Sequence, residues 1–224
     1  MRNKLLRAIC FILICAVGSS SLPAVELTFV GSSNAVVRDF TGSGVFTQFS
    51  NGSGGLSIRK FQGPLPSGTP LDERSLIAFD VRSRGDTEIL RAYLDFYITG
   101  YTSRSDNVGI LGYSSNGVLS ISDATRSAKH LSQYHAPTLG LGKQSIELDV
   151  PVLQSIITPF TQYLGFRLQG LGTPLNTQLA HINSGFNSPP TLRFIVVPEP
   201  AGWILFAISA TALVNGRFAR TRLG

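Results

Sequence analysis

Apolar and polar residues alternate with a period of two along much of the chain, which predicts β-strands. The clearest case is 89–98, where one predicted inward face carries Leu90, Ala92, Leu94, Phe96 and Ile98. The same alternation recurs in three later segments, whose predicted inward residues are Ile146, Leu148, Val150, Leu164, Phe166, Leu168, Leu192, Phe194 and Val196. Repeated half-buried strands predict antiparallel sheets with apolar inner faces.

Further strands are expected at 27–30, 35–40, 45–49, 56–61, 75–81, 108–114, 118–122 and 179–182. Asn116-Gly117, between two such runs, predicts a hairpin turn. No period is evident in 124–141, which is expected to form a loop.

One short helix is expected after Asp149, which has the side chain of an N-cap. Pro151 suits its first turn, and Leu153, Ile156 and Ile157 give it an apolar side. Together these elements predict an all-β domain at 25–196, an antiparallel β-sandwich of jelly-roll type with about ten strands.

The segment 1–24 has the composition of a secretory signal peptide. A basic start, MRNKLLR, precedes the short apolar run Ala8–Val17 and then small residues. Cleavage is expected after Ala24, with a site near Ser19 or Ser20 as the alternative. Both cysteines of the chain lie in this segment, so the exported domain is expected to be held together without disulfides. Acylation of Cys15, as in a lipoprotein, is the less favoured alternative, because no small residue precedes it.

The segment 197–224 differs from everything before it. Val197-Pro-Glu-Pro200 leads into a 14-residue apolar run, Ala201–Val214, and then into RFARTRLG. As a helix this run rises about 21 Å, short of the roughly 30 Å hydrocarbon core of a bilayer. Trp203 at one end and arginines at the other are the flanks of a membrane helix, and arginine side chains lengthen the span. A single membrane helix is therefore expected at about 201–216; a buried core helix is the alternative.

The formal charge of +6 belongs to the two ends of the chain. Six of the 19 basic residues lie there, namely Arg2, Lys4, Arg7, Arg217, Arg220 and Arg222. The middle of the chain keeps the other basic side chains and all the acidic ones except Glu199, so it is nearly neutral. A nucleic-acid-binding domain normally carries a basic patch on the fold itself. Composition therefore points to no nucleic-acid partner.

The succession of Pro198, Glu199 and Pro200, an apolar run and terminal arginines resembles the PEP-CTERM sorting signal of Gram-negative bacteria. The resemblance covers 197–224 and the signal peptide that accompanies such tails. It departs from the family pattern in its interspersed arginines and in Asn215. It implies a membrane-embedded cysteine transpeptidase, exosortase, as a partner. It also implies transient anchoring in the inner membrane, followed by delivery to the cell envelope, cell surface or extracellular matrix.

A second resemblance covers about 72–196. The segments RSLIAFDV, LRAYLDFYI and SPPTLRF are similar in cadence to bacterial surface β-sandwich modules of the DNRLRE type, which resemble carbohydrate-binding modules. The motif that names these modules is absent. The resemblance implies a β-sandwich fold and no particular activity.

No residue pattern points to catalysis or to a metal. GYSSN (112–116) begins like a G-x-S-x-G nucleophile elbow but ends in Asn and lies among strands. His130 and His135 are five residues apart and share no helical or strand face, while His181 lies far along the chain. Asp106, Asn107 and Asp123 are the residues available for a structural calcium ion, without a dense acidic loop. The chain is therefore expected to be no enzyme and to have no cofactor.

The candidate binding surface is the polar face formed by Arg91, Tyr93, Asp95 and Tyr97. Tyrosines on a sheet face stack on sugar rings, and arginine and aspartate form hydrogen bonds with hydroxyl groups. The alternative is that the tyrosines pack under a loop or a second sheet. The only tryptophan lies in the tail, so the domain has no indole platform.

Two functions follow from these observations. The first is a non-enzymatic protein of the cell surface or matrix, sorted through its tail and associated with exopolysaccharide or biofilm. The second is a carbohydrate-binding module that recognises polysaccharide through the Tyr93/Tyr97 face.

Overall fold

The computed structural model describes residues 24–51, 56–61, 70–85, 87–101, 107–171, 178–183 and 189–197. The chain divides into two compact units, Glu26–Val196 and the pair of ends Met1–Val25 with Val197–Gly224. The expected signal peptide and membrane helix lie outside the described residues. Within the described part, no helix has the length and apolar character needed to cross a membrane.

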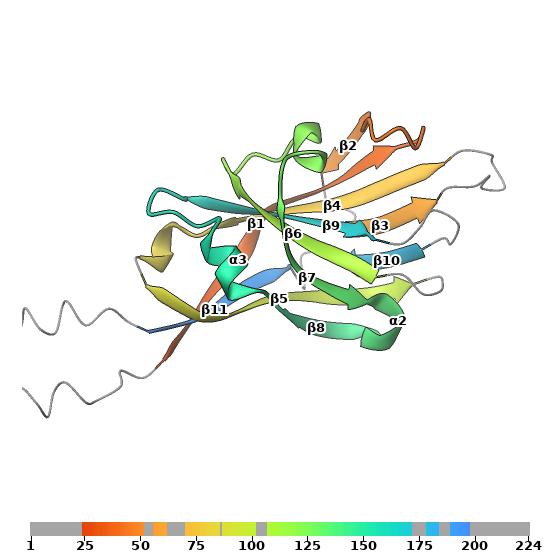
Figure 1. Cartoon of the computed structure of the whole chain (residues 1–224). Helices are drawn as coiled ribbons and strands as arrows, with labels where there is room; N and C mark the ends of the chain where they lie inside the picture. Colours follow the sequence, from red (N-terminus) through yellow and green to blue (C-terminus); the bar gives the residue numbers. More distant parts are fainter. Residues whose placement is uncertain are drawn as a thin grey trace, which may run out of the picture. The chain divides into compact units, whose positions relative to one another are not determined.

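The described elements are mainly strands (Figure 1). They are β1 (Val25–Asp39), β2 (Gln48–Asn51), β3 (Leu56–Phe61), β4 (Leu71–Asp80), β5 (Glu88–Tyr101), β6 (Asn107–Ser115), β7 (Lys129–His135), β8 (Gly142–Glu147), β9 (Tyr163–Gly170), β10 (Gln178–Asn183) and β11 (Thr191–Val197). Two short α-helices, α2 (Ala136–Leu139) and α3 (Val150–Gln154), and two 3-10 turns, η1 (Arg82–Arg84) and η2 (Ile121–Ala124), connect them. The all-β prediction is confirmed.

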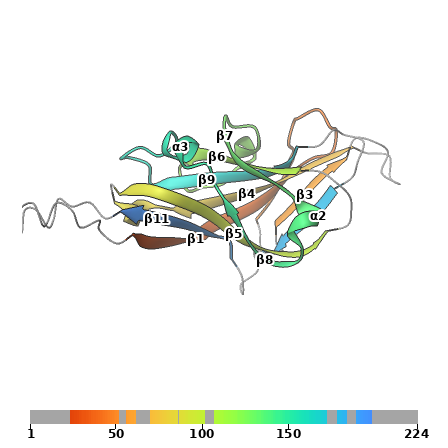
Figure 2. The same cartoon turned by 60° about the horizontal axis from the view of Figure 1, so that its bottom comes forward.

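The strands form one sheet that nearly closes on itself. Its order is β2-β1-β11-β5-β10-β3-β4-β9-β6-β7, with β8 added beside β5. Because β1 also pairs with β4, the path returns from β4 to β1. The pairs whose register the described residues define are antiparallel. Figure 2 shows the result as two layers, β4, β9 and β6 facing β11, β5 and β8, consistent with a β-sandwich.

The main core lies between the layers and follows the predicted alternation. Its central aromatic side chains include Phe79 and Phe166, which meet edge to face at 5.4 Å between ring centroids, and Phe194, which lies 5.3 Å from Phe29. The even-numbered residues of β5 from Ala92 to Ile98 are buried as predicted. Leu90 is the exception, since it is 46% exposed and its neighbour Ile89 is buried instead. The alternation therefore begins only after the first residues of β5.

A smaller apolar cluster lies on the opposite face of β1 and β4. It comprises Ala35, Val37, Phe46, Leu76, Ala78, Leu119 and Ala124. Leu119 and Ala124 come from the segment between β6 and β7, which the sequence predicted to contain a strand at 118–122. That prediction and the hairpin at Asn116-Gly117 are wrong. The Asn116 side chain accepts a hydrogen bond from Val118 N, and the chain then crosses the sheet and forms η2.

The segment 124–141, expected to be a loop, contains β7 and α2. β7 pairs with β6, and its register shifts between Ile110 and Leu111, so that Ser132 and His130 face successive β6 residues. A bulge of this kind interrupts the period of two. The interruption explains why the sequence pattern shows no strand there. α3 confirms the predicted helix, because the Asp149 carboxylate accepts a hydrogen bond from Val152 N and Leu153 is fully buried.

One of the buried carboxylates lies where β1, β3 and β4 meet. Glu73 on β4 is fully buried and pairs with Arg38 on β1, while Arg59 Nε on β3 lies 3.3 Å from its other oxygen. Ser57 donates a further hydrogen bond to this carboxylate. Glu73 therefore links three strands, and an unpaired carboxylate at this position would be costly.

The ring of Tyr113 on β6 packs closely against Gly165 on β9, and a substitution of this glycine tests the packing between the two strands. Tyr113 lies opposite Gly165 in the β6–β9 register, and a Cβ on Gly165 would lie 2.3 Å from Tyr113 Cε2. We expect Gly165→Ala to lower the free energy of unfolding by about 1–3 kcal/mol, because the ring must be displaced. Urea unfolding measures this. Gly31→Ala is the matched control, since its nearest neighbours would lie at 3.4 Å; equal midpoints for the two variants would contradict the expectation.

Candidate functional site

The four predicted residues lie on the outer face of β5, but their environments differ. Asp95 is 2% exposed and Tyr97 is 41% exposed, with Arg91 exposed and Tyr93 half-buried. The neighbouring strand β8 places Glu147 opposite Tyr93, Ser145 opposite Asp95 and Lys143 opposite Tyr97. This outer face of β5 and β8 is called the polar face below.

Arg193 on β11 contacts several residues of the polar face, and it was not among the binding residues predicted from the sequence. Its Nε and Nη2 donate to the two oxygens of Asp95 at 2.5 and 3.2 Å, and Nη2 also donates to Ser145 Oγ at 3.0 Å. Its Nη1 lies 3.2 Å from Glu26 Oε2 on β1. One guanidinium thus joins β1, β11, β5 and β8. The alternation in β11 marked Arg193 as outward, but nothing in the sequence places β11 beside β5.

The ion pair changes the acidity of both partners. Burial of Asp95 acts to raise its pKa, but hydrogen bonds from Arg193 and Ser145 and the positive charges of Arg193 and Lys143 outweigh it and hold the pKa below its usual value. Hydrogen bonding to Asp95 in turn raises the pKa of Arg193. Both groups therefore remain charged over the physiological range, and Asp95 is not arranged as a general acid.

The ring of Tyr93 is already engaged by two cations. The guanidinium carbons of Arg91 and Arg193 lie 5.3 and 5.0 Å from its centroid. Arg91 is held in turn by Glu147, at 2.9 Å between Nε and Oε1, in an exposed ion pair. Cation–π contacts of this kind fix the ring in place. Tyr93 is therefore part of the internal contacts of the polar face.

Tyr97 is the aromatic side chain of the polar face that is more open to a ligand. Tyr97 is more exposed than Tyr93. Lys143, which lies opposite Tyr97 on β8, has a side chain that is 75% exposed. The Lys143 ammonium lies 4.0 Å from Asp95, so its charge is only loosely compensated. A ring and an ammonium side by side suit a polar ring-shaped ligand such as a sugar unit.

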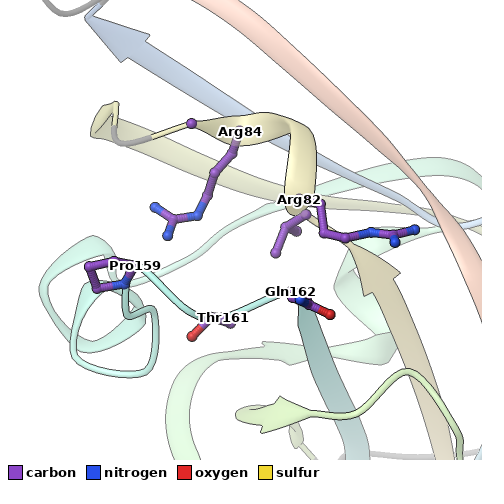
Figure 3. Close-up of a pocket in the computed structure, with 7 residues that line it drawn as sticks. Arg82, Arg84, Pro159, Thr161 and Gln162 are labelled. Carbon is purple, nitrogen blue, oxygen red and sulfur yellow. The ribbon is translucent and has the colours of Figure 1, made fainter.

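A pocket of ≈ 210 Å³ lies at a different place, between η1 and the turn that precedes β9 (Figure 3). It is lined by Val81, Arg82, Arg84, Gly85, Pro159, Thr161 and Gln162. In Figure 3 the Arg84 guanidinium lies toward Pro159, where it donates to Thr158 O at 2.9 Å, while Arg82 points away and pairs with Asp80. Pockets for drug-sized ligands hold roughly 300–1,000 Å³, so this one suits at most a small group.

The remaining sequence candidates are not brought together into a site. Ser114 of GYSSN lies within β6, without a nucleophile elbow. His130 is exposed and His135 half-buried on β7, and the side chain of His181 and all of Asp106 lie outside what the structure describes. Asp123 is buried and its carboxylate accepts from Ser120 and pairs with Arg126, while Asn107 begins β6. Among the described residues, no group of three or more His, Cys, Asp or Glu side chains is placed to bind a metal ion.

The predicted sorting residues lie beyond the end of the described chain. They are Pro198, Glu199, Pro200, Trp203, Arg217, Arg220 and Arg222.

Comparison with known proteins shows no family membership. No protein-family model matches the chain, and no curated protein matches it. Solved structures give faint likenesses. One is a carbohydrate-binding module, CBM28, described as specific for non-crystalline cellulose, with 16% identity and a TM-score of 0.30 over 71% of this chain and 84% of that one.

Two more solved structures are of the same kind. One is described as showing the promiscuous specificity of carbohydrate-binding modules of the β-sandwich superfamily, at 9% identity and a TM-score of 0.24, over 80% of this chain and 94% of that one. The other is the family 11 carbohydrate-binding module of a Clostridium thermocellum cellulosomal cellulase, at 11% identity and a TM-score of 0.19, over 80% and 88%. Likenesses at this level carry no argument about function.

The Asp95–Arg193 pair predicts a pH-dependent contribution to stability. A carboxyl whose pKa is lowered by folding stabilises the native state above its ordinary pKa of 3.8 and loses that contribution as the pH falls through the lower, folded-state pKa. We expect Asp95→Asn to lower the free energy of unfolding by about 2 kcal/mol at pH 7. The difference from the unsubstituted protein should shrink as the pH falls below 3.8 and through the lowered pKa of Asp95.

Urea unfolding at a series of pH values measures this difference. Glu147→Gln removes a carboxylate from an exposed ion pair on the same face and should leave the midpoint nearly unchanged. A deficit of Asp95→Asn that does not shrink as the pH is lowered below 3.8 would show that the ion pair is not its source.

Proposed function

We propose that this chain is an exported, non-enzymatic β-sandwich protein that is sorted to the cell surface or extracellular matrix through its C-terminal segment 197–224. The observation that carries the proposal is the succession of Pro198-Glu199-Pro200, an apolar run and terminal arginines. A signal peptide at 1–24 and a membrane helix at about 201–216 belong to the same proposal. Exosortase is the partner that acts on the tail.

The arrangement of the folded unit is compatible with removal of the tail. The compact unit ends at Val196, and the last described strand, β11, ends at Val197. A cut at or after the Pro-Glu-Pro motif would therefore remove no strand residue. The buried side chains of β11, Leu192, Phe194 and Val196, all precede it. A sorting signal of this kind must be separable from the fold that it delivers.

The second candidate function is direct binding of exopolysaccharide through the polar face. The observation in its favour is the exposed Tyr97 ring beside the Lys143 ammonium. Tyr93 takes a supporting part here, because its ring is occupied by Arg91 and Arg193. The charges of the polar face largely compensate one another, which favours a neutral or weakly anionic glycan. We also propose that the strands of the β-sandwich are connected as in a jelly roll.

The sorting proposal predicts double processing. In a Gram-negative host that carries exosortase, protein recovered outside the cytoplasm should begin near Val25 and end near the Pro-Glu-Pro motif, as measured by mass spectrometry of its terminal peptides. Glu199→Ala should leave the tail attached. Glu147→Ala, which removes an exposed carboxylate of the domain, should be processed like the unsubstituted protein. Recovered protein that still ends at Gly224 would overturn the sorting proposal.

The binding proposal predicts different effects for the two tyrosines. Tyr97→Ala should weaken retention on purified exopolysaccharide by about tenfold or more, because the stacking partner is lost, and should leave the unfolding midpoint nearly unchanged. Tyr93→Ala should lower the midpoint as well, because two guanidinium groups lose their ring. Affinity electrophoresis measures retention, and urea unfolding measures stability. If a folded Tyr97→Ala variant is retained as strongly as the unsubstituted protein, the proposal of direct binding through the polar face is wrong.

A further inference from the structure

The most exposed large hydrophobic side chain among the described residues is Phe160, at 91%. It lies in the turn Thr158–Thr161, with Pro159 before it. Thr161 N donates to Thr158 O at 3.0 Å, and Thr158 N donates to Thr161 Oγ1 at 2.8 Å. Proline presets the second position of such a turn. The ring is therefore displayed on a closed turn.

The turn is also braced against the rest of the domain. Arg84 of η1 donates to Thr158 O at 2.9 Å, and Thr161 is buried. Immediately afterwards, Gln162 O accepts from Val81 N at 2.9 Å, which joins the start of β9 to the end of β4. Exposure of a large aromatic ring costs free energy, and a braced turn prevents the ring from folding back onto the surface. Such a ring is well placed to bury itself in something outside the domain.

The strand directions place this turn at the end of the domain where the chain leaves β11. β1 runs antiparallel to β4, so the start of β1 lies at the end of β4 that leads into η1. Glu26 near the start of β1 pairs with Arg193, and Gly31 N donates to Pro190 O, so β11 runs toward the start of β1. In Figure 1, η1 and the ends of β1 and β11 accordingly lie at one end of the domain, with α2 at the other.

Two other exposed side chains at this end are apolar as well. Val25 and Leu90, at the starts of β1 and β5, are 41% and 46% exposed. The arginines of η1 do not make the end strongly cationic, because Asp80 pairs with Arg82 and the carboxylates of Glu26 and Glu88 are near the same strand ends. A surface that met this end would be held mainly by apolar contact, with little dependence on salt.

The length of the connecting chain identifies that surface. Only Pro198, Glu199 and Pro200 separate Val197 from the apolar run that begins at Ala201. Extended backbone covers at most about 14 Å over this distance. If the apolar run is inserted in a bilayer, the end of β11 must lie within that reach of the bilayer surface.

We propose that, while the tail is anchored, this end of the domain rests on the lipid surface and Phe160 inserts among the headgroups. The inference rests on the proposed membrane insertion of the tail. Aromatic side chains prefer the bilayer interface, and an aromatic anchor limits the rotation of a domain that is attached by a short tether. Phe160 thereby limits the orientations that the domain can adopt on the bilayer.

The test uses the full chain with Cys10 and Cys15 replaced by Ser and an environment-sensitive nitrobenzoxadiazole label on Phe160→Cys. The protein is reconstituted in vesicles of phosphatidylethanolamine and phosphatidylglycerol. Leu141→Cys is the matched control, because Leu141 is also apolar and 63% exposed, but lies beside Gly142, which pairs with Ile98 far from the start of β5. Trp203, the only tryptophan, reports separately on the tail.

We expect the label at position 160 to shift to the blue and to be quenched by lipids that carry a spin label, while the label at position 141 stays in water. The shielding should persist at high salt. A blue-shifted Trp203 together with equal, aqueous signals at both labelled positions would overturn the inference while leaving the sorting proposal intact. Aqueous Trp203 would overturn the insertion of the tail itself. Shielding at position 160 that grows with protein density and is unaffected by spin-labelled lipid would indicate a second copy of the chain and would also overturn the inference.

Discussion

The fold depends on one strand that belongs to both layers. β1 is 15 residues long, and its first half lies beside β11 while its second half pairs with β4. This double pairing closes the sheet and leaves β1 with few unpaired backbone groups. The same strand supplies Phe29 and Val36 to the main core and Ala35 and Val37 to the smaller cluster. The described residues contain no cysteine, so this closure constrains the strands without a disulfide bond.

Charged groups reinforce the places where strands from different parts of the chain meet. Arg193 joins four strands on the outer face, and Glu73 joins three strands inside. Arg167 Nη1 donates to the carbonyl oxygens of Asp123, Ala124 and Arg126 and so holds η2 over the sheet. Buried ion pairs contribute little net stability, but removal of one partner is costly. These contacts therefore fix the register of the strands more than they strengthen the core.

The sequence was informative where the period of two was unbroken. β9 and β11 lie where the alternation predicted them, and β3 and β10 overlap the further strands expected at 56–61 and 179–182. The burial of β11 follows the alternation residue by residue. β7 was missed because a bulge shifts its register opposite Ile110 and Leu111. The Asn116-Gly117 hairpin failed because the turn is closed by the Asn116 side chain, after which Leu119 is drawn into the smaller cluster. The packing of Leu119 on distant strands was not visible in the sequence.

The candidate site shows the same limit more sharply. The alternation placed Arg91, Tyr93, Asp95 and Tyr97 on one face, but it did not predict that their burial and contacts differ. Their distinct environments come from Arg193, which is 98 residues from Asp95 in the chain. Because this guanidinium contacts both the Asp95 carboxylate and the Tyr93 ring, these two residues contribute to holding the strands together. What is left for recognition is the outer edge of the polar face, at Tyr97 and Lys143. A ligand there would meet one ring and one loosely paired cation, a combination that allows weak, repeated contacts along a polymer.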